Sequence, residues 1–180
     1  VIINGEKETG VTTFFINKKI DEGDIIDSMR VKINDGYSAG ILHDKLMSVG
    51  AELVLKTVNN IFINTFSRKK QIISDKDKLA PKIDKELCKI NLKKSSKEIV
   101  RLIKGLSPYP GAKLKFNNKY YKIIDCKKTD INYSNKSIMF VENNKLYFKN
   151  FKNESIEILE LQAEGKKIMK SSDFLRGNKL

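Results

Sequence analysis

The first third of the chain combines short apolar runs with one long helical stripe. Residues 10–17 (GVTTFFIN) are rich in β-branched and aromatic side chains, which predicts a strand of a sheet covered on both faces. A second apolar run, over 24–33, ends at the Asn-Asp-Gly turn signal of 34–36 and predicts another strand. From Ser38, a residue type suited to the N-cap, to Phe62, apolar residues recur at three- and four-residue steps and predict an amphipathic helix. Two strands and such a helix indicate a piece of an α/β layer.

A polar stretch of mixed charge, residues 64–87, follows this part and predicts a linker that crosses a surface. A second helix is predicted from the capping-box spacing at 95–98, with apolar residues at helical steps up to Leu106. Pro108 and Pro110 remove backbone donors and bias the residues before them away from the α region, so the helix must end there.

The C-terminal part shows short β-type runs separated by asparagine turns. Because paired asparagines tolerate positive φ, the pairs at 117–118 and 143–144 suit tight hairpins. A run of short strands at this close spacing favours a small antiparallel barrel of the oligonucleotide/oligosaccharide-binding (OB) type. A short helix is predicted near 172–176. The predicted strands are 113–116, 120–126, 137–141, 146–151 and 156–161.

These patterns divide the chain into three parts. We expect an α/β piece over residues 1–63, a linker over 64–87 and an OB-like antiparallel β-barrel over 88–180. The longest apolar runs are short pieces such as 138–141, far below the roughly 20 apolar residues that a membrane span needs. We therefore expect no membrane partner.

The scarcity of cysteine and histidine limits the chemistry further. Cys88, Cys126 and His43 are scattered along the sequence, which predicts neither a disulfide framework nor a structural zinc site. No apolar targeting segment follows Val1. These features favour a cytoplasmic protein that holds no metal.

Charge is concentrated in the C-terminal part. The 180 residues carry 35 Lys or Arg against 22 Asp or Glu, for a formal net charge of +13. Residues 88–180 alone hold 21 basic and 9 acidic side chains, a net charge of +12, whereas residues 1–87 are almost neutral. Such an asymmetry indicates a polyanionic partner, nucleic acid or a phospholipid surface; the alternative is a composition biased toward lysine and asparagine.

The type of cation indicates how a nucleic acid would be held. Lysine binds phosphate as a point charge, whereas the planar reading of a base edge favours arginine. Because 31 of the 35 cations are lysines, we expect a salt-sensitive grip on the nucleic-acid backbone. The residues predicted to contact nucleic acid are Lys93, Lys94, Lys97, Arg101, Lys104, Lys166 and Lys167.

An acidic cluster is the feature of the N-terminal part that can carry chemistry. It surrounds Gly23 in the loop between the two predicted strands, at the edge of the expected sheet. Ligands of open α/β sheets gather at such an edge, and a carboxylate there can act as a base or orient one. A solvated loop without chemistry is the alternative. The cluster consists of Asp21, Glu22, Asp24 and Asp27.

Several segments, in this order and at this spacing, carry a resemblance to a known family. The first half contributes 8–12 (ETGVT), 20–24 (IDEGD) and 42–46 (LHDKL). The second half contributes 80–82 (APK), 90–92 (INL), 103–105 (IKG), 108–112 (PYPGA) and the ending over 161–175. Together they resemble the folate-dependent formyltransferases and, among these, the methionyl-tRNA formyltransferase family.

The resemblance implies a Rossmann-like domain that binds formyl-tetrahydrofolate, followed by a barrel that helps to hold the initiator tRNA. In the family's reaction, the α-amino group of methionyl-tRNA attacks the formyl carbon of 10-formyltetrahydrofolate. An Asp in an Asp-x-Gly loop orients a catalytic His and an ordered water, and this Asp matches Asp21. By the same resemblance, the pterin pocket is lined by Lys18, Lys19, Ile20, Glu22, Gly23 and Asp24.

The family's Asn-x-His-Pro stretch, which carries the catalytic Asn and His, does not occur in this sequence, and the resemblance places it just before Val1. His43 matches a helix-opening piece instead and is expected on a helix surface or in a capping role. We therefore expect a C-terminal portion of a monomeric enzyme that does not catalyse alone. The alternatives are a stand-alone basic RNA-binding module and a sugar-amine N-formyltransferase.

Overall fold

The computed structural model describes residues 1–72, 78–130 and 137–178, so residues 73–77 of the predicted linker lie outside the described residues. The chain separates into two compact units. We call Glu6–Asp35 with Ile41–Lys82 the N-terminal unit. The C-terminal unit comprises Val1–Gly5, Gly36–Gly40 and Ile83–Leu180.

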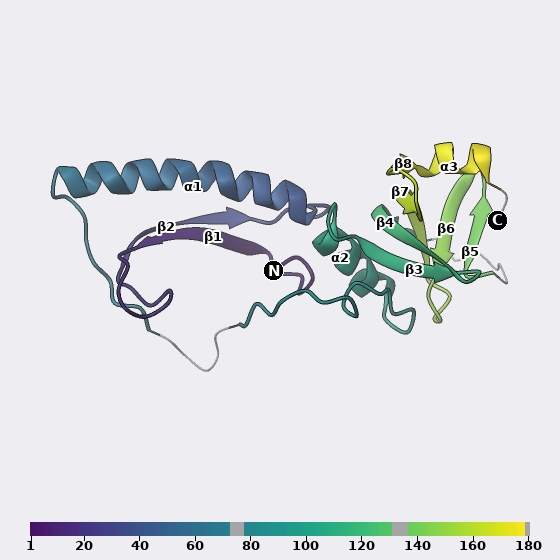
Figure 1. Cartoon of the computed structure of the whole chain (residues 1–180), viewed down its shortest axis with the longest axis horizontal. Coiled ribbons are helices and arrows are strands. Elements are labelled where there is room, and N and C mark those ends of the chain that lie inside the picture. Colours follow the sequence, from purple (N-terminus) through teal and green to yellow (C-terminus); the bar gives the residue numbers. More distant parts are fainter. Residues whose placement is uncertain (73–77, 131–136, 179–180) are drawn as a thin grey trace. The chain divides into compact units, whose positions relative to one another are not determined.

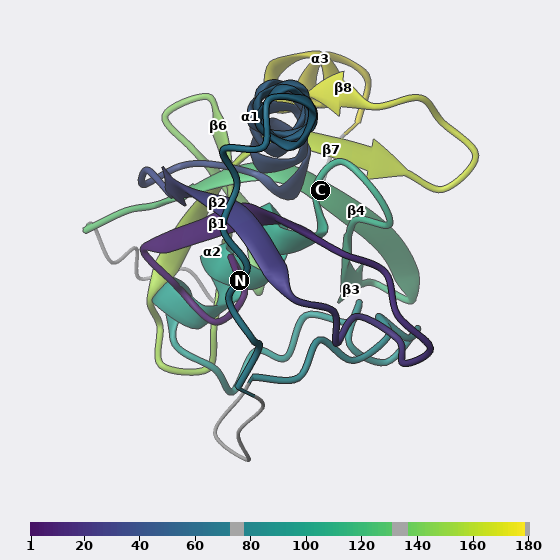
Figure 2. The same ribbon diagram turned by 90° about the vertical axis from the view of Figure 1, so that its left-hand side faces the viewer.

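The N-terminal unit consists of a two-stranded antiparallel sheet and a long helix (Figure 1). Strand β1 (Glu8–Phe14) pairs with β2 (Ile25–Lys32), and α1 (Ala39–Phe62) runs beside them. Figure 2 looks along α1 and shows the two strands on one side of it. The hydroxyls of Thr13 on β1 and Thr57 on α1 lie 2.9 Å apart, and Lys56 on α1 pairs with Asp27 on β2 at 2.8 Å.

Both strands and this helix were predicted, with different bounds. Strand β1 ends at Phe14 because the register shifts between Thr13 and Phe14, and the residues up to Asp24 form a loop. The expected cover of both sheet faces is not seen for these strands within the described residues. Within the described residues β1 pairs with β2 alone, and its side chains alternate between exposed and half-buried.

The C-terminal unit contains an antiparallel sheet with the strand order β3-β4-β7-β6-β5, to which β8 is added through β7 (Figure 1). Helices α2 and α3 accompany it. No pairing joins β3 to β5 in the described part of the chain, so the antiparallel sheet is confirmed and a closed barrel is not. The bounds are α2 (Ser96–Leu106), β3 (Ala112–Phe116), β4 (Lys119–Lys128), β5 (Met139–Glu142), β6 (Lys145–Lys149), β7 (Ser155–Ala163), β8 (Met169–Lys170) and α3 (Ser171–Gly177).

An apolar core forms where α2 and α3 pack against this sheet. Alternate residues of the strands point into it, and fully burying each such side chain stabilises the fold by about 1.5–3 kcal/mol. The C-terminal unit therefore has a core of its own. Its fully buried side chains include Ile99, Ile103, Leu106, Leu114, Ile123, Met139, Leu146, Phe148, Ile156, Ile158 and Leu161.

The asparagine turns have the predicted form. Asn117 and Asn118 link β3 to β4 with φ of 47° and 60°, and Asn143 and Asn144 link β5 to β6 with φ of 48° and 58°. Two successive residues with positive φ match the right-handed twist of the flanking strands. The turns thus fix the register of both hairpins.

Helix α2 is bounded as the sequence predicted. Ser95 and Glu98 form a capping box at its start, and it ends at Leu106, after which Ser107 is extended (φ −92°, ψ 137°). Strand β6 ends earlier than predicted, at Lys149, because the side chain of Asn150 accepts hydrogen bonds from the backbone N–H groups of Lys152 and Glu154. These bonds fold the chain into a turn.

Candidate active-site loop and nucleic-acid interface

All seven residues of the predicted folate-side site lie in the connection between β1 and β2. The loop is closed at its base by the Phe15 N–H, which donates to the Asp24 carbonyl at 3.0 Å. Asn17 spans it: its side-chain N–H donates to the Glu22 carbonyl at 3.2 Å, and its Oδ1 accepts from the Lys19 N–H at 2.8 Å. These bonds hold the loop in one shape.

A second segment of the N-terminal unit clamps the same loop. The side-chain amide of Gln71 donates to the carbonyls of Asp21 and Gly23, at 2.9 and 2.7 Å. Nearby, Lys69 and Ile25 exchange backbone hydrogen bonds of 2.8 and 2.9 Å. Gln71 falls in the predicted linker and was not predicted as a site residue, because nothing local marks its partners about fifty residues away.

Asp21 has the backbone conformation that its position demands. Its φ is 56°, in the left-handed region that Asp and Asn visit more readily than most residues. Among the described residues its carboxylate makes no hydrogen bond or ion pair, and its side chain is exposed. The loop therefore fixes the backbone of Asp21 and leaves its carboxylate available to a ligand or another side chain.

Gly23 occupies a point where no side chain fits. A Cβ placed there would collide with the carbonyl oxygen of Phe15 and would lie 3.3 Å from the ring of Phe14. Gly23 is buried, in contrast to the surrounding loop. This glycine lets the loop close tightly behind Asp21.

The other predicted residues of the loop differ in their surroundings. Lys19 pairs with Glu22 at 2.9 Å, so these two charges compensate each other. Lys18 and Ile20 are exposed, Ile20 at 89%, and Asp24 is half-buried. The loop therefore presents apolar surface beside a free carboxylate.

An aromatic and cationic cluster next to the base of the loop was not predicted. The guanidinium carbon of Arg68 lies 4.2 Å from the ring centroid of Phe15 and 5.7 Å from that of Phe66. The two rings meet edge to face with centroids 5.7 Å apart. Cation–π contacts of this kind stabilise by about 0.5–1 kcal/mol at exposed sites.

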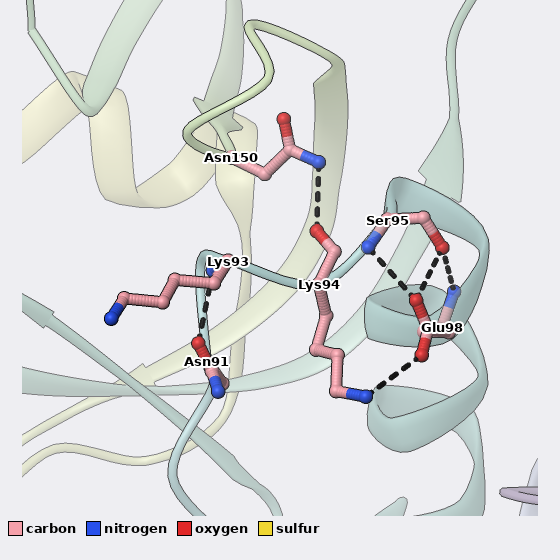
Figure 3. A network of polar contacts seen from close by, with 6 residues as sticks. All are labelled: Asn91, Lys93, Lys94, Ser95, Glu98 and Asn150. Atoms are coloured by element: carbon pink, nitrogen blue, oxygen red, sulfur yellow. Dashed lines mark hydrogen bonds and ion pairs between the residues drawn. The ribbon is translucent and has the colours of Figure 1, made fainter.

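In the C-terminal unit, a hydrogen-bond network positions Lys94 at the start of α2 (Figure 3). The Lys94 ammonium pairs with Glu98 at 3.1 Å, and the Lys94 carbonyl accepts from the side chain of Asn150 at 2.9 Å. Hydrogen bonds from Ser95, and then the Lys94 ammonium, lower the pKa of Glu98 to about 2. The charge of Lys94 is thus partly neutralised by a carboxylate of the same helix.

Three of the cations predicted to contact nucleic acid lie on α2, and their surroundings differ. Lys104 pairs with Asp125 and its side chain is only 17% exposed, so its charge is largely compensated. The guanidinium of Arg101 lies against the backbone of Gly5. Lys97 is exposed and has no ion pair with any described residue. Of the two lysines on α2, Lys97 is therefore exposed and uncompensated within the described residues, whereas Lys104 is not.

The remaining predicted cations are exposed on turns. Lys93 points away from the network around α2, and its backbone N–H donates to Asn91 at 2.9 Å (Figure 3). Lys166 and Lys167 lie in the turn between β7 and β8, where the Lys166 N–H donates to the Ala163 carbonyl at 3.0 Å. These three ammonium groups make no ion pair within the described residues.

No group of three or more His, Cys, Asp or Glu side chains in the described residues could hold a metal ion. His43 is exposed on α1, with its Nδ1 3.1 Å from Asp44, so it lies on a helix surface as expected. Among the described residues, no helix is long and apolar enough to cross a membrane.

Comparison with known sequences identifies the class of the protein. A model for formyl transferases matches residues 1–58, and a model for the formyl transferase C-terminal domain matches residues 82–179. The chain belongs to the formyltransferase family. Its antiparallel sheets and helices are those of the formyltransferase fold.

Methionyl-tRNA formyltransferases are among the relatives that it resembles. That of Azobacteroides pseudotrichonymphae is 43% identical over 98% of this chain and 58% of its own length. That of Flavobacterium johnsoniae is 39% identical over 98% of this chain and 57% of its own. The chain therefore spans a little over half the length of these relatives.

Solved structures show the same fold. HypX from Aquifex aeolicus matches 97% of this chain and 32% of its own with a TM-score of 0.74, at 17% identity. An N-formyltransferase from Helicobacter canadensis, solved with folinic acid and dTDP-3-aminofucose, is 26% identical with a TM-score of 0.66. It covers 87% of this chain and 57% of its own.

Proposed function

We propose that these residues belong to a methionyl-tRNA formyltransferase, which transfers the formyl group of 10-formyltetrahydrofolate to the α-amino group of initiator methionyl-tRNA. The observation that carries the proposal is the 43% identity to a methionyl-tRNA formyltransferase over 98% of the chain. The sugar N-formyltransferase of H. canadensis is only 26% identical. We further propose a monomeric, cytoplasmic enzyme without a metal or a membrane partner.

The proposed division follows the sequence analysis. Residues 1–63 are the end of a Rossmann-like catalytic domain, 64–87 are a linker, and 88–180 are an OB-like domain that binds tRNA. The two family matches, over 1–58 and 82–179, support a change of domain between these positions. The small antiparallel sheet with its own core supports the second assignment.

In the proposed mechanism, Asp21 positions the catalytic histidine of the family. A carboxylate beside an imidazole raises the imidazole pKa and fixes its tautomer, so that the ring can take the proton of the attacking amine. The fixed backbone and free carboxylate of Asp21 suit this role. This histidine is not among the 180 residues, whose single His is His43, so we propose that they do not catalyse alone.

The loop residues fit the folate co-substrate. The exposed Ile20 offers apolar surface to a pterin ring, and Gly23 allows close approach of the backbone. Lys18, Lys19, Glu22 and Asp24 provide polar groups around it. The co-substrate supplies the formyl group, while these residues bind and orient it.

The test is a hybrid enzyme in which the preceding residues of the A. pseudotrichonymphae relative are joined before Val1. We expect the hybrid to formylate methionyl-tRNA, and Asp21→Asn to lower kcat by about 10²–10⁴-fold through loss of acid–base assistance. Asp44→Asn, an exposed Asp on α1, is the matched control and should leave kcat unchanged.

Other outcomes favour the alternatives. Formylation of a dTDP-amino sugar in preference to tRNA would support a sugar N-formyltransferase. Salt-dependent tRNA binding without any formylation would support an RNA-binding module. Formylation by the 180 residues alone at the rate of the hybrid would contradict the proposed need for an additional histidine.

A further inference from the structure

A pocket in the C-terminal unit collects lysines that the sequence analysis did not single out. It has a volume of about 480 Å³, and its wall includes four lysines. Strand β3 contributes Lys113, and β4 contributes Lys122. The segment before α2 contributes Lys85 and Lys89. None of these four was among the predicted nucleic-acid contacts.

Sheet register brings three of these lysines into one row. Lys89 is bridged to Lys113, Lys113 faces Lys122 across β3 and β4, and Lys122 faces Gln162 across β4 and β7. Residues directly opposite each other on neighbouring strands project to the same face. The row is held by the backbone, since the Lys113 N–H donates to the Cys88 carbonyl at 2.7 Å.

Lys113 and Lys122 form an unfavourable pair in the absence of a ligand. Like charges directly opposite on antiparallel strands destabilise a sheet, and both side chains are half-buried. Within the described residues neither lysine has an ion pair, although Glu164 also lines the pocket. Lys89 differs, because Glu86 pairs with it at 2.6 Å and raises its pKa. An anion between Lys113 and Lys122 would relieve their repulsion.

Tyr120 places an aromatic ring beside the facing lysines. It lies two residues before Lys122 on β4, hence on the same face of the strand and about 7 Å away along it. It lines the pocket and is 41% exposed. Stacking on such a ring is a common way to hold an unpaired base of RNA. A cationic pair and a ring at this spacing match the phosphate and the base of one nucleotide.

We propose that this pocket binds one unstacked nucleotide of an RNA, with its phosphate between Lys113 and Lys122 and its base on Tyr120. Lys85 and Lys89 add positive charge at the border of the site, and Gln162 continues the row. The proposal rests on the proposed function only in taking the RNA to be the initiator tRNA.

The test is the binding of the 180-residue chain to fluorescently labelled initiator tRNA, followed by anisotropy at several salt concentrations. Lys113→Gln with Lys122→Gln should weaken binding at least tenfold at low salt. It should also reduce the slope of log K against log salt by about 0.7–0.9, because the one phosphate held between the two lysines is no longer neutralised. Lys128→Gln with Lys152→Gln removes the same charge from exposed positions outside the pocket and should change affinity less than threefold.

Tyr120 variants test the base contact separately. Tyr120→Ala should weaken binding about 5- to 100-fold, and Tyr120→Phe should restore it, because the ring is what stacks. If Tyr120→Ala binds the tRNA as the unchanged chain does, the nucleotide assignment is overturned. The same holds if inorganic phosphate raises the melting temperature as much as a uridine dinucleotide at equal concentration.

Stability measurements separate a binding role from a structural one. The Lys113→Gln, Lys122→Gln chain should melt at the same temperature as the unchanged chain or higher, because a repulsion is removed. Equal tRNA affinity and salt slope in this variant, or an equal loss in the control variant, overturns the proposal. If the double variant does not fold, Lys122→Gln alone should still weaken binding and lower the slope, by at most about 0.7–0.9.

The two proposals can fail independently. A hybrid enzyme that formylates methionyl-tRNA while Lys113→Gln with Lys122→Gln leaves KM for tRNA unchanged removes the pocket proposal only. A hybrid without formylation, combined with the expected pocket effects on RNA binding, removes the proposed function and keeps the pocket.

Discussion

At the scale of single residues, the loop that carries Asp21 depends on backbone groups more than on its charges. Gln71 holds two of its carbonyls, and Asn17 holds its two arms together. Of the acidic side chains that made this region conspicuous in the sequence, Glu22 pairs with Lys19 within the loop, and Asp27 pairs with Lys56 from strand β2. The geometry of the loop is therefore best tested by a substitution at a glycine of its backbone, Gly23.

Gly23→Ala should disturb this loop. Its new methyl group would collide with the Phe15 carbonyl, so the loop must open and strain the bonds from Gln71. We expect a local destabilisation of about 1–3 kcal/mol, typical of overpacking, seen as faster amide exchange over residues 15–24. Gly177→Ala is the control, because nothing lies within 4 Å of its Cβ position. Unchanged exchange in the loop of the Gly23 variant would contradict this reading.

The two cysteines should be unreactive in the folded chain. Both thiols are free and buried, and burial raises the pKa of Cys126 to about 12, so it stays protonated at pH 8. In a Cys88→Ser variant, a chromogenic disulfide reagent at pH 8 should modify Cys126 only as fast as the C-terminal unit opens. Guanidinium should make the reaction immediate. Rapid modification without denaturant would show that Cys126 is accessible.

The sequence predicted site residues whose partners lie close to them along the chain, and missed those whose partners lie far away. The acidic loop was located because its residues are neighbours along the chain. Gln71 was missed because its partners are almost fifty residues away. The same limit applies to Lys104, whose charge is compensated by Asp125 on β4, and to the facing pair Lys113 and Lys122. Contacts between separate segments of the chain, which composition does not show, decide all three.

At the scale of elements, the start of α2 combines a local and a long-range constraint. Ser95 and Glu98 complete the predicted capping box, and Asn150 adds a hydrogen bond to the Lys94 carbonyl from a distant turn. A capping box satisfies two backbone N–H donors that would otherwise lack partners at the helix start. Its energetic role should therefore appear when the Glu98 carboxylate loses its charge.

Acid should remove the contribution of Glu98. Its pKa falls from the usual 4.5 to about 2, chiefly through the Ser95 hydrogen bond, so its stabilisation is present above pH 4.5. It disappears as pH falls from 4.5 toward 2. The free-energy gap between the unchanged chain and Glu98→Gln, measured by urea unfolding, should shrink across this window. A gap that stays constant from pH 6 to about pH 2.5 would assign the effect to something other than charge.

Elements with a strong local signal were predicted, and β8, which is defined by its pairing alone, was not. The paired asparagines set both hairpin turns, and the two prolines ended α2. Strand β8 has two residues, too few for any alternation to appear, and is defined only by its pairing with β7. Whether the sheet closes is likewise a property of its edges, which a pattern of short strands does not determine.

At the scale of the whole molecule, the two units differ in how much they bury. The C-terminal unit encloses a cluster drawn from its sheet and from both of its short helices. The N-terminal unit has few deeply buried apolar side chains, among them Val31, Leu42 and Leu53. A two-stranded sheet alone is marginally stable in water. With so few buried apolar side chains, the helix beside it adds little buried area to offset chain entropy.

We therefore predict that the N-terminal unit opens far more often than the C-terminal one. Along α1 several apolar side chains are exposed, including Leu55 at 65% and Phe62 at 81%. In native-state amide exchange, Ile25–Lys32 should be weakly protected, whereas β4 and β7 should exchange only through global unfolding.

The hybrid enzyme described above provides the comparison for this prediction. If the proposed Rossmann-like domain is completed by its preceding residues, the exposed side chains of α1 gain cover, and protection of Ile25–Lys32 should rise by at least tenfold. Protection of β4 and β7 should stay as it was, because that core is already complete. Equal protection of both units in the 180-residue chain would mean that the small sheet and α1 are stable without further cover.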